Sequence, residues 1–186
     1  MARIFIGLEL PGIVRDHLSL LCGGVPGARW EAHDKLHMTL RFVGDIEGES
    51  LRRLGDALDR VHAPALRLEL AGVGFFPPRG QPKSLWAGVA DARALVELNR
   101  RIARALASTD VPPDPRKFAP HVTLARLRDA PDDRVAGFLA QHALFRTAPF
   151  ELGAFAMFSS VLGPTGSKYR LERRYPLEDD EPDSSC

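Results

Sequence analysis

The tetrapeptide His-X-Thr-X occurs twice in this chain, as His-Met-Thr-Leu at residues 37–40 and as His-Val-Thr-Leu at residues 121–124. Each copy lies in a run of residues typical of a β-strand. In an extended strand, residues i and i+2 point to the same side, so each histidine shares a face with its threonine while the X residues face the core. Two copies facing each other would place two imidazoles and two hydroxyls around one cavity. Because imidazole titrates near neutral pH, this set predicts metal-free acid/base chemistry on a phosphodiester.

The repetition of the motif carries this interpretation. A lone histidine in a strand is usually a packed or surface residue, so one copy alone would indicate almost nothing. Two copies with the same apolar pattern are a much stronger indication. The other histidines lack a partner motif and are interpreted as ordinary helix or loop residues: His17, His33, His62 and His142.

The fifth position after each motif histidine is Phe42 in the first copy and Arg126 in the second. This position has odd parity relative to the histidine, so an ideal strand would place it on the opposite face. A β-bulge or the end of the strand would be needed to bring Arg126 into the cavity. For Phe42, packing in the core and stacking on a base are both open.

The hydrophobic pattern predicts the elements that must position these residues. Strands are expected over residues 3–10, 29–31, 35–43, 66–70, 84–89, 120–128, 146–152, 154–161 and 168–174. Helices are expected over residues 11–22 and 49–62, from a cap at Asp91 to Leu106, and over residues 132–142. The dipeptide Gly44-Asp45 is expected to end the first motif strand, residues 75–80 to form a turn, and residues 163–166 to join two strands as a hairpin.

The order of these elements repeats along the chain. Each half contains a strand, a helix, a motif strand and another helix, and the motif histidines stand at positions 37 and 121. We infer a duplication from this element order alone. The pattern predicts an α+β fold with antiparallel sheets rather than a parallel βαβ sheet.

Chain length, the N-terminal stretch and the cysteines bear on domain organisation and location. The chain has 186 residues, enough for one domain or two small lobes. Its first apolar stretch is interrupted at Glu9 and Pro11 and lacks the h-region of a signal peptide, so we expect a cytoplasmic location. The two cysteines, Cys22 and Cys186, do not form a disulfide framework or a metal-ligand pair.

The last nine residues, 178–186, carry five acidic residues and no basic one. Without them, 25 Lys and Arg residues stand against 19 Asp and Glu residues, a net charge of +6. This mildly basic body suits an anionic ligand but is far from the charge of a general nucleic-acid coat protein. We expect the acidic tail to be disordered.

The chain resembles the 2H phosphoesterase superfamily and, within it, the bacterial and archaeal RNA 2′,3′-cyclic phosphodiesterases, once called 2′-5′ RNA ligases. The resemblance covers about residues 3–177 and is carried by residues 3–10, 36–44, 85–89, 120–126 and 163–166, followed by Tyr169. It implies one bilobal α+β domain over residues 1–177. In that domain, two pseudo-twofold-related lobes of antiparallel sheet with outer helices enclose a central groove holding both motifs.

The resemblance also implies a reaction and a site. The reaction is hydrolysis of a 2′,3′-cyclic phosphate to a 2′-phosphomonoester without metal or cofactor, with His37 as proton donor and His121 as proton acceptor. Thr39 and Thr123 would hold the non-bridging phosphate oxygens, Arg126 would balance the negative charge, and Phe42 is a candidate for binding the base. The near symmetry of the motifs does not by itself decide which histidine is the acid.

The expected partners are RNA with 2′,3′-cyclic phosphate ends or cyclic nucleotides. We expect a monomer that does not associate with membranes. The resemblance implies reverse 2′-5′ RNA ligation as a minor activity. Two alternatives belong to other classes: a non-catalytic RNA-end-binding module of the same fold, and a metal-dependent hydrolase that uses the histidines as ligands, although the sequence lacks an Asp/Glu/Cys cluster to complete such a site.

Overall fold

The computed structural model of the chain describes residues 2–163 and 166–178. The helices are α1 (Gly12–Ser19), α2 (Gly48–Leu58), α3 (Arg93–Leu106) and α4 (Asp132–Gln141), with a short 3-10 helix at His33–Lys35. The strands are β1 (Ala2–Glu9), β2 (Ala28–Trp30), β3 (His37–Ile46), β4 (Leu66–Leu68), β5 (Leu70–Phe76), β6 (Ser84–Val89), β7 (Val122–Leu127), β8 (Phe150–Leu152), β9 (Ala154–Gly163) and β10 (Gly166–Pro176).

Two antiparallel half-sheets meet at the motif strands. The strand order is β10-β9-β1-β3-β7-β6-β5, with β2 paired to the side of β7, and β4 and β8 form a separate two-stranded sheet. The motif strands β3 and β7 pair only at Met38 and Val122. Because only one residue pair joins β3 to β7, the sheet consists of two lobes. The first lobe contains β10-β9-β1-β3, and the second contains β7-β6-β5 with β2. The α+β fold with two lobes is therefore confirmed.

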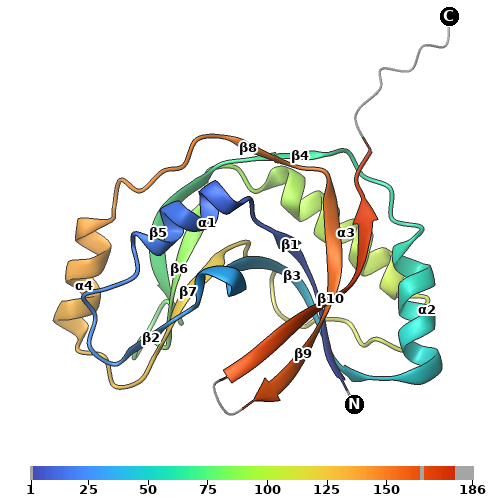
Figure 1. The fold of residues 1–186 in the computed structure, drawn as a ribbon, viewed down its shortest axis with the longest axis horizontal. Coiled ribbons are helices and arrows are strands. Elements are labelled where there is room, and N and C mark those ends of the chain that lie inside the picture. The colour runs from blue at the N-terminus through green and yellow to red at the C-terminus, as the bar shows by residue number, and fades with distance from the viewer. Residues whose placement is uncertain (1, 164–165, 179–186) are drawn as a thin grey trace, which may run out of the picture.

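The apolar faces of both lobes share one core. The apolar stripe of α3 is buried, and so are the X residues of both motifs. The stripe consists of Leu95, Leu98, Ile102 and Leu106, and the X residues are Met38, Leu40, Val122 and Leu124. Helices α2 and α4 lie at opposite ends of the molecule, outside the half-sheets (Figure 1). No helix in the described part of the chain is long and apolar enough to cross a membrane.

The prediction that Gly44-Asp45 ends the first motif strand is wrong. Strand β3 continues to Ile46, and Gly44 still pairs with Ile4 of β1. Gly44 has a φ of 97°, a backbone conformation that glycine adopts without strain. The glycine therefore permits a bulge instead of a break.

Strand β5 was missed because its glycines hide the strand pattern. Residues 75 and 76, expected in a turn, end this strand, where Phe76 pairs with Ser84 of β6. Gly74 pairs with Trp86, and a Cβ atom at Gly74 would lie 2.2 Å from the Trp86 ring. Glycine is thus required here by the close approach of an indole, which no local pattern reveals.

Several boundaries also differ from the prediction. Helices α1 and α2 end before the predicted residues 22 and 62, and β8 is shorter than the predicted strand over residues 146–152. The predicted hairpin pairs β9 with β10, but residues 164 and 165 of its loop lie outside the described residues. Glu178 belongs to the fold, because its backbone N–H donates to the Ala63 carbonyl at 3.0 Å. The rest of the acidic tail, residues 179–186, lies outside the described part.

Candidate active site

A β-bulge at the same motif position in both copies shapes the site. In the pairing of β1 with β3, Gly7 faces Thr39 and Ile6 faces Arg41, which leaves Leu40 as the extra residue. In the pairing of β6 with β7, Trp86 faces Thr123 and Leu85 faces Ala125, which leaves Leu124 as the extra residue. Each bulge inserts one residue and resets the alternation of side chains.

The bulges explain how the fifth motif position reaches the cavity. Thr39 and Phe42 line one groove together, and Thr123 and Arg126 line the same groove from the second lobe. Without the extra residue, Phe42 and Arg126 would face the core. The β-bulge that the sequence analysis required to bring Arg126 into the cavity is therefore present.

His37 is held in one tautomer by the backbone carbonyl of Lys35. Its Nδ1 atom donates to the Lys35 carbonyl oxygen at 2.6 Å, and its Nε2 atom lies 3.1 Å from Thr39 Oγ1. Because a carbonyl only accepts, Nδ1 must carry a hydrogen. In the neutral ring, Nε2 is then the acceptor and faces the Thr39 hydroxyl.

His121 repeats this arrangement in the second lobe. Its Nδ1 atom donates to the Ala119 carbonyl oxygen at 2.7 Å, again two residues before the histidine. Its ring lies edge-on to Phe76, with 5.0 Å between the ring centroids. Both histidines therefore keep Nε2 as the atom that can exchange a proton with a ligand.

Both motifs line a single open groove with a volume of about 1040 Å³. The groove contains all the site residues predicted from the sequence: His37, Thr39, Phe42, His121, Thr123 and Arg126. Phe42 is 50% exposed, so the structure places it on the groove wall and not in the core. The four other histidines do not line the groove.

The electrostatics of the groove disfavour two protonated imidazoles. Burial lowers the pKa of His37; its hydrogen bond to Lys35 raises this pKa, and positive charge on His121 and Arg126 lowers it. Burial likewise lowers the pKa of His121, the hydrogen bond to Ala119 raises it, and Arg126 lowers it. A site with two adjacent imidazoles and a fixed cation favours a state with at most one proton on the pair.

The family model for LigT-like phosphoesterases matches residues 8–86 and 88–169, and each stretch contains one motif. The chain belongs to the LigT-like phosphoesterase family. A relative from Thermus thermophilus named RNA 2′,3′-cyclic phosphodiesterase is 31% identical over an alignment 187 residues long, gaps included. The alignment covers 94% of this chain and 90% of the relative. One of the same name from Archaeoglobus fulgidus is 26% identical over 171 residues, covering 90% of this chain and 96% of the relative.

Solved structures share the fold of this phosphoesterase. The protein TT0787 of Thermus thermophilus has a TM-score of 0.79 at 24% identity, and the alignment covers 96% of this chain and 99% of that one. E. coli LigT complexed with 3′-AMP has a TM-score of 0.77 at 23% identity, with 95% and 98% of the two chains covered.

Several residues of the phosphoesterase groove were missed by sequence reasoning. Phe76 was assigned to a turn, yet it contacts His121 from the end of β5. Arg41 is only 10% exposed in its side chain and donates to the Pro112 carbonyl, which ties β3 to the loop that leads to His121. Arg41 precedes Phe42 directly, but only tertiary structure shows that this loop passes it.

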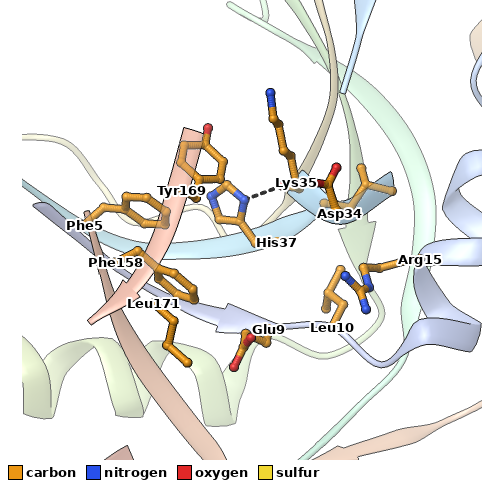
Figure 2. Close-up of a pocket in the computed structure, with 11 residues that line it drawn as sticks. Phe5, Glu9, Leu10, Arg15, Asp34, Lys35, His37, Phe158, Tyr169 and Leu171 are labelled. Carbon is orange, nitrogen blue, oxygen red and sulfur yellow. Dashed lines mark hydrogen bonds between the residues drawn. The ribbon is translucent and has the colours of Figure 1, made fainter. Parts of the chain in front are cut away.

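A smaller cavity of about 220 Å³ adjoins the groove at His37, and the two cavities share Phe5, Lys35, His37 and Tyr169. Figure 2 shows the His37 ring between the aromatic side chains and Lys35. Its centroid lies 4.9 Å from that of Phe5 and 5.2 Å from that of Tyr169. These rings limit the rotation of the imidazole.

No group of three His, Cys, Asp or Glu side chains suited to hold a metal ion occurs among residues 2–163 and 166–178.

We predict that Arg126→Gln raises the pKa of both imidazoles, because the guanidinium charge lowers both. An NMR titration of the histidine ring protons in both proteins would measure the shift. Unchanged titration of both rings in the variant would show that Arg126 does not act on them.

The lowered pKa values also affect the stability of the wild-type protein. Both rings take up a proton more easily in the unfolded chain than in the folded one, so protonation favours unfolding. The free energy of unfolding should therefore decrease as pH falls below the ordinary imidazole pKa of about 6.5.

Proposed function

We propose that this protein hydrolyses RNA 2′,3′-cyclic phosphate ends to 2′-phosphomonoesters by acid/base catalysis with His37 and His121, without a metal ion. The observation that carries the proposal is the paired geometry of the two rings. Each donates Nδ1–H to a carbonyl two residues earlier, and both line one groove. The names of the relatives support the choice of an RNA cyclic phosphate over other phosphodiesters.

The proposed reaction is an in-line displacement at phosphorus. His121 Nε2 accepts a proton from the attacking water, whose oxygen forms the new bond to phosphorus. The bond from phosphorus to the ribose 3′-oxygen breaks, and protonated His37 gives its Nε2 proton to that oxygen. The starting state needs one neutral and one protonated imidazole, and mutual repulsion of the two rings disfavours the unproductive state in which both are protonated.

The remaining side chains stabilise charge and orientation in this proposal. The Thr39 and Thr123 hydroxyls donate to the non-bridging phosphate oxygens, and Arg126 offsets the negative charge that builds up in the transition state. The exposed ring of Phe42 stacks on the terminal base. 2′-5′ ligation, the reverse of cleavage at a 2′-5′ linkage, would use the two histidines in the same roles. The 5′-hydroxyl of a second RNA would replace water, give its proton to His121 and bond to phosphorus, while the bond to the 3′-oxygen breaks and His37 protonates that oxygen.

An RNA oligonucleotide with a 2′,3′-cyclic phosphate end tests this function. We expect a 2′-phosphate product only, formed at the same rate with and without excess EDTA. The double variant His37→Ala/His121→Ala controls for contaminating nucleases. A 3′-phosphate product would overturn the proposed geometry, and loss of activity in EDTA that zinc or manganese restores would overturn the metal-free mechanism. Tight binding without turnover would indicate an RNA-end-binding module.

A further inference from the structure

The groove continues beyond His37 over the sheet of the first lobe. Antiparallel residues that oppose each other share one face of a sheet. Arg3 of β1 opposes Ser160 of β9, and Ser160 opposes Tyr169 of β10. All three line the groove, so they form a polar row across three adjacent strands.

An aromatic row lies between this polar row and the centre of the groove. Phe42, Phe5 and Phe158 are in register across β3, β1 and β9. The Phe5 centroid lies 5.0 Å from that of Phe158 in a stacked arrangement and 5.1 Å from that of Tyr169. Phe5 and Phe158 are themselves buried, at 3% and 7% exposure, so they form the floor on which the exposed rings rest. The rings that can stack on a base of single-stranded RNA are those of Tyr169 and Phe42.

The polar row has the exposure and charge to contact a ligand. Tyr169 is 37% exposed, and the side chain of Arg3 is 59% exposed. The acidic partner of Arg3, Asp45, lies 3.9 Å from Arg3 Nε, which is longer than a hydrogen bond. The guanidinium therefore remains able to donate to a phosphate.

The chemistry of the substrate determines through which atom the RNA continues from the site. A 2′,3′-cyclic phosphate occupies both the 2′ and 3′ oxygens of the terminal ribose, so the RNA continues only through the 5′ oxygen. With His37 beside the 3′ oxygen, the terminal ribose lies on the side of the first lobe. On that side, the groove is lined by the polar row on β1, β9 and β10.

We infer that this row is a binding site for the nucleotide that precedes the cyclic end. Arg3 and Ser160 bind the phosphate on the 5′ oxygen of the terminal ribose, and Tyr169 stacks on the preceding base. The inference rests on the proposed function and on the role of His37 in it. Its consequence is selection of RNA ends over free cyclic mononucleotides.

Three substrates separate the two contacts: a 2′,3′-cyclic mononucleotide, the same compound with a 5′-phosphate, and a dinucleotide with the same cyclic end. Each enzyme is characterised by the ratios of kcat/KM between them, which cancel any direct effect on His37. The 5′-phosphate should raise kcat/KM over the plain mononucleotide, and Arg3→Gln should reduce this ratio by about tenfold. The second nucleoside should raise kcat/KM further, and Tyr169→Leu should reduce that ratio by about tenfold. Each reduction is the scale of one lost phosphate or stacking contact.

Arg170→Gln is the matched control for Arg3→Gln. It removes the same charge from the same half-sheet and breaks an equally loose ion pair, Arg170–Glu172 at 3.9 Å. Arg170 opposes Ser159 and alternates with Tyr169, so it lies on the face away from the groove. Its substrate ratios should match those of the wild type. For the dinucleotide, Arg3→Gln should also reduce the dependence of log kcat/KM on log salt by about 0.7, as for one lost phosphate contact on a single strand.

Two results would overturn the inference. Unchanged ratios in Arg3→Gln and Tyr169→Leu would show that the row does not contact the RNA. Reduced ratios in Lys117→Gln instead would show that the strand crosses the second lobe, where Lys117 lines the groove. Failure of the wild type to hydrolyse any of the three substrates is distinct from both, because it would overturn the proposed function itself.

Discussion

His37→Ala and His121→Ala are each expected to lower kcat/KM on a cyclic-phosphate RNA end by at least about 100-fold, the usual scale for loss of a general acid or base. Each variant leaves one imidazole in place, but neither a lone acid nor a lone base completes the proton transfer. The measurement is steady-state kinetics on purified protein. Because both rings line the open groove, circular dichroism should show an intact fold.

His62→Ala is the control for these two variants. His62 is an exposed histidine after α2, and it pairs with Glu178 at 3.1 Å, away from the groove. Its removal should leave kcat/KM unchanged. Near wild-type turnover in either motif variant, with the fold intact, would refute the catalytic role of that histidine.

Thr39→Val and Thr123→Val are expected to cost on the order of 1–3 kcal/mol of transition-state stabilisation each, the range for an unmade hydrogen bond to a charged group. This corresponds to a loss of roughly 5- to 150-fold in kcat/KM. Valine keeps the shape and β-branching of threonine and removes the hydroxyl. The melting temperature should therefore stay the same or rise for Thr123→Val, whereas Thr39→Val also removes the contact of the hydroxyl with His37 Nε2.

Thr147→Val should show the opposite behaviour. The Thr147 hydroxyl is buried and accepts the backbone N–H of Leu70 at 3.0 Å. Its loss leaves a buried donor without a partner, so stability should decrease while kcat/KM is retained. If the two motif variants kept normal rates with equal or higher melting temperatures, the threonines would be strand residues without a role in catalysis.

The central features of the site were predictable because they depend on strand parity alone. The motif spacing predicted which residues face the core, and Met38 and Val122 are fully buried, as expected. The paired motifs likewise predicted that His37 and His121 share one groove, as they do. Helix α3 was predictable for the same kind of reason, since its apolar stripe is long and regular.

Features that depend on close approach between distant strands were not predictable. Gly44 and Gly74 indicate a break or a turn when read locally, but the first permits a bulge and the second makes room for Trp86. The position of Arg126 depends on a bulge at Leu124 that no local signal marks. The contact of Phe76 with His121 requires β5 and β7 to lie on the two sides of β6.

The pH dependence of kcat/KM in the wild type and in the two histidine variants tests the central claim most directly. The wild type should give a bell-shaped profile whose apparent pKa values belong to the pair of imidazoles. If His121 is the base and His37 the acid, the residual activity of His121→Ala should lose the fall in rate at low pH, and that of His37→Ala should lose the fall at high pH. Exchange of these two results would reverse the assignment of acid and base. A bell with both limbs intact in either variant would contradict two-histidine catalysis.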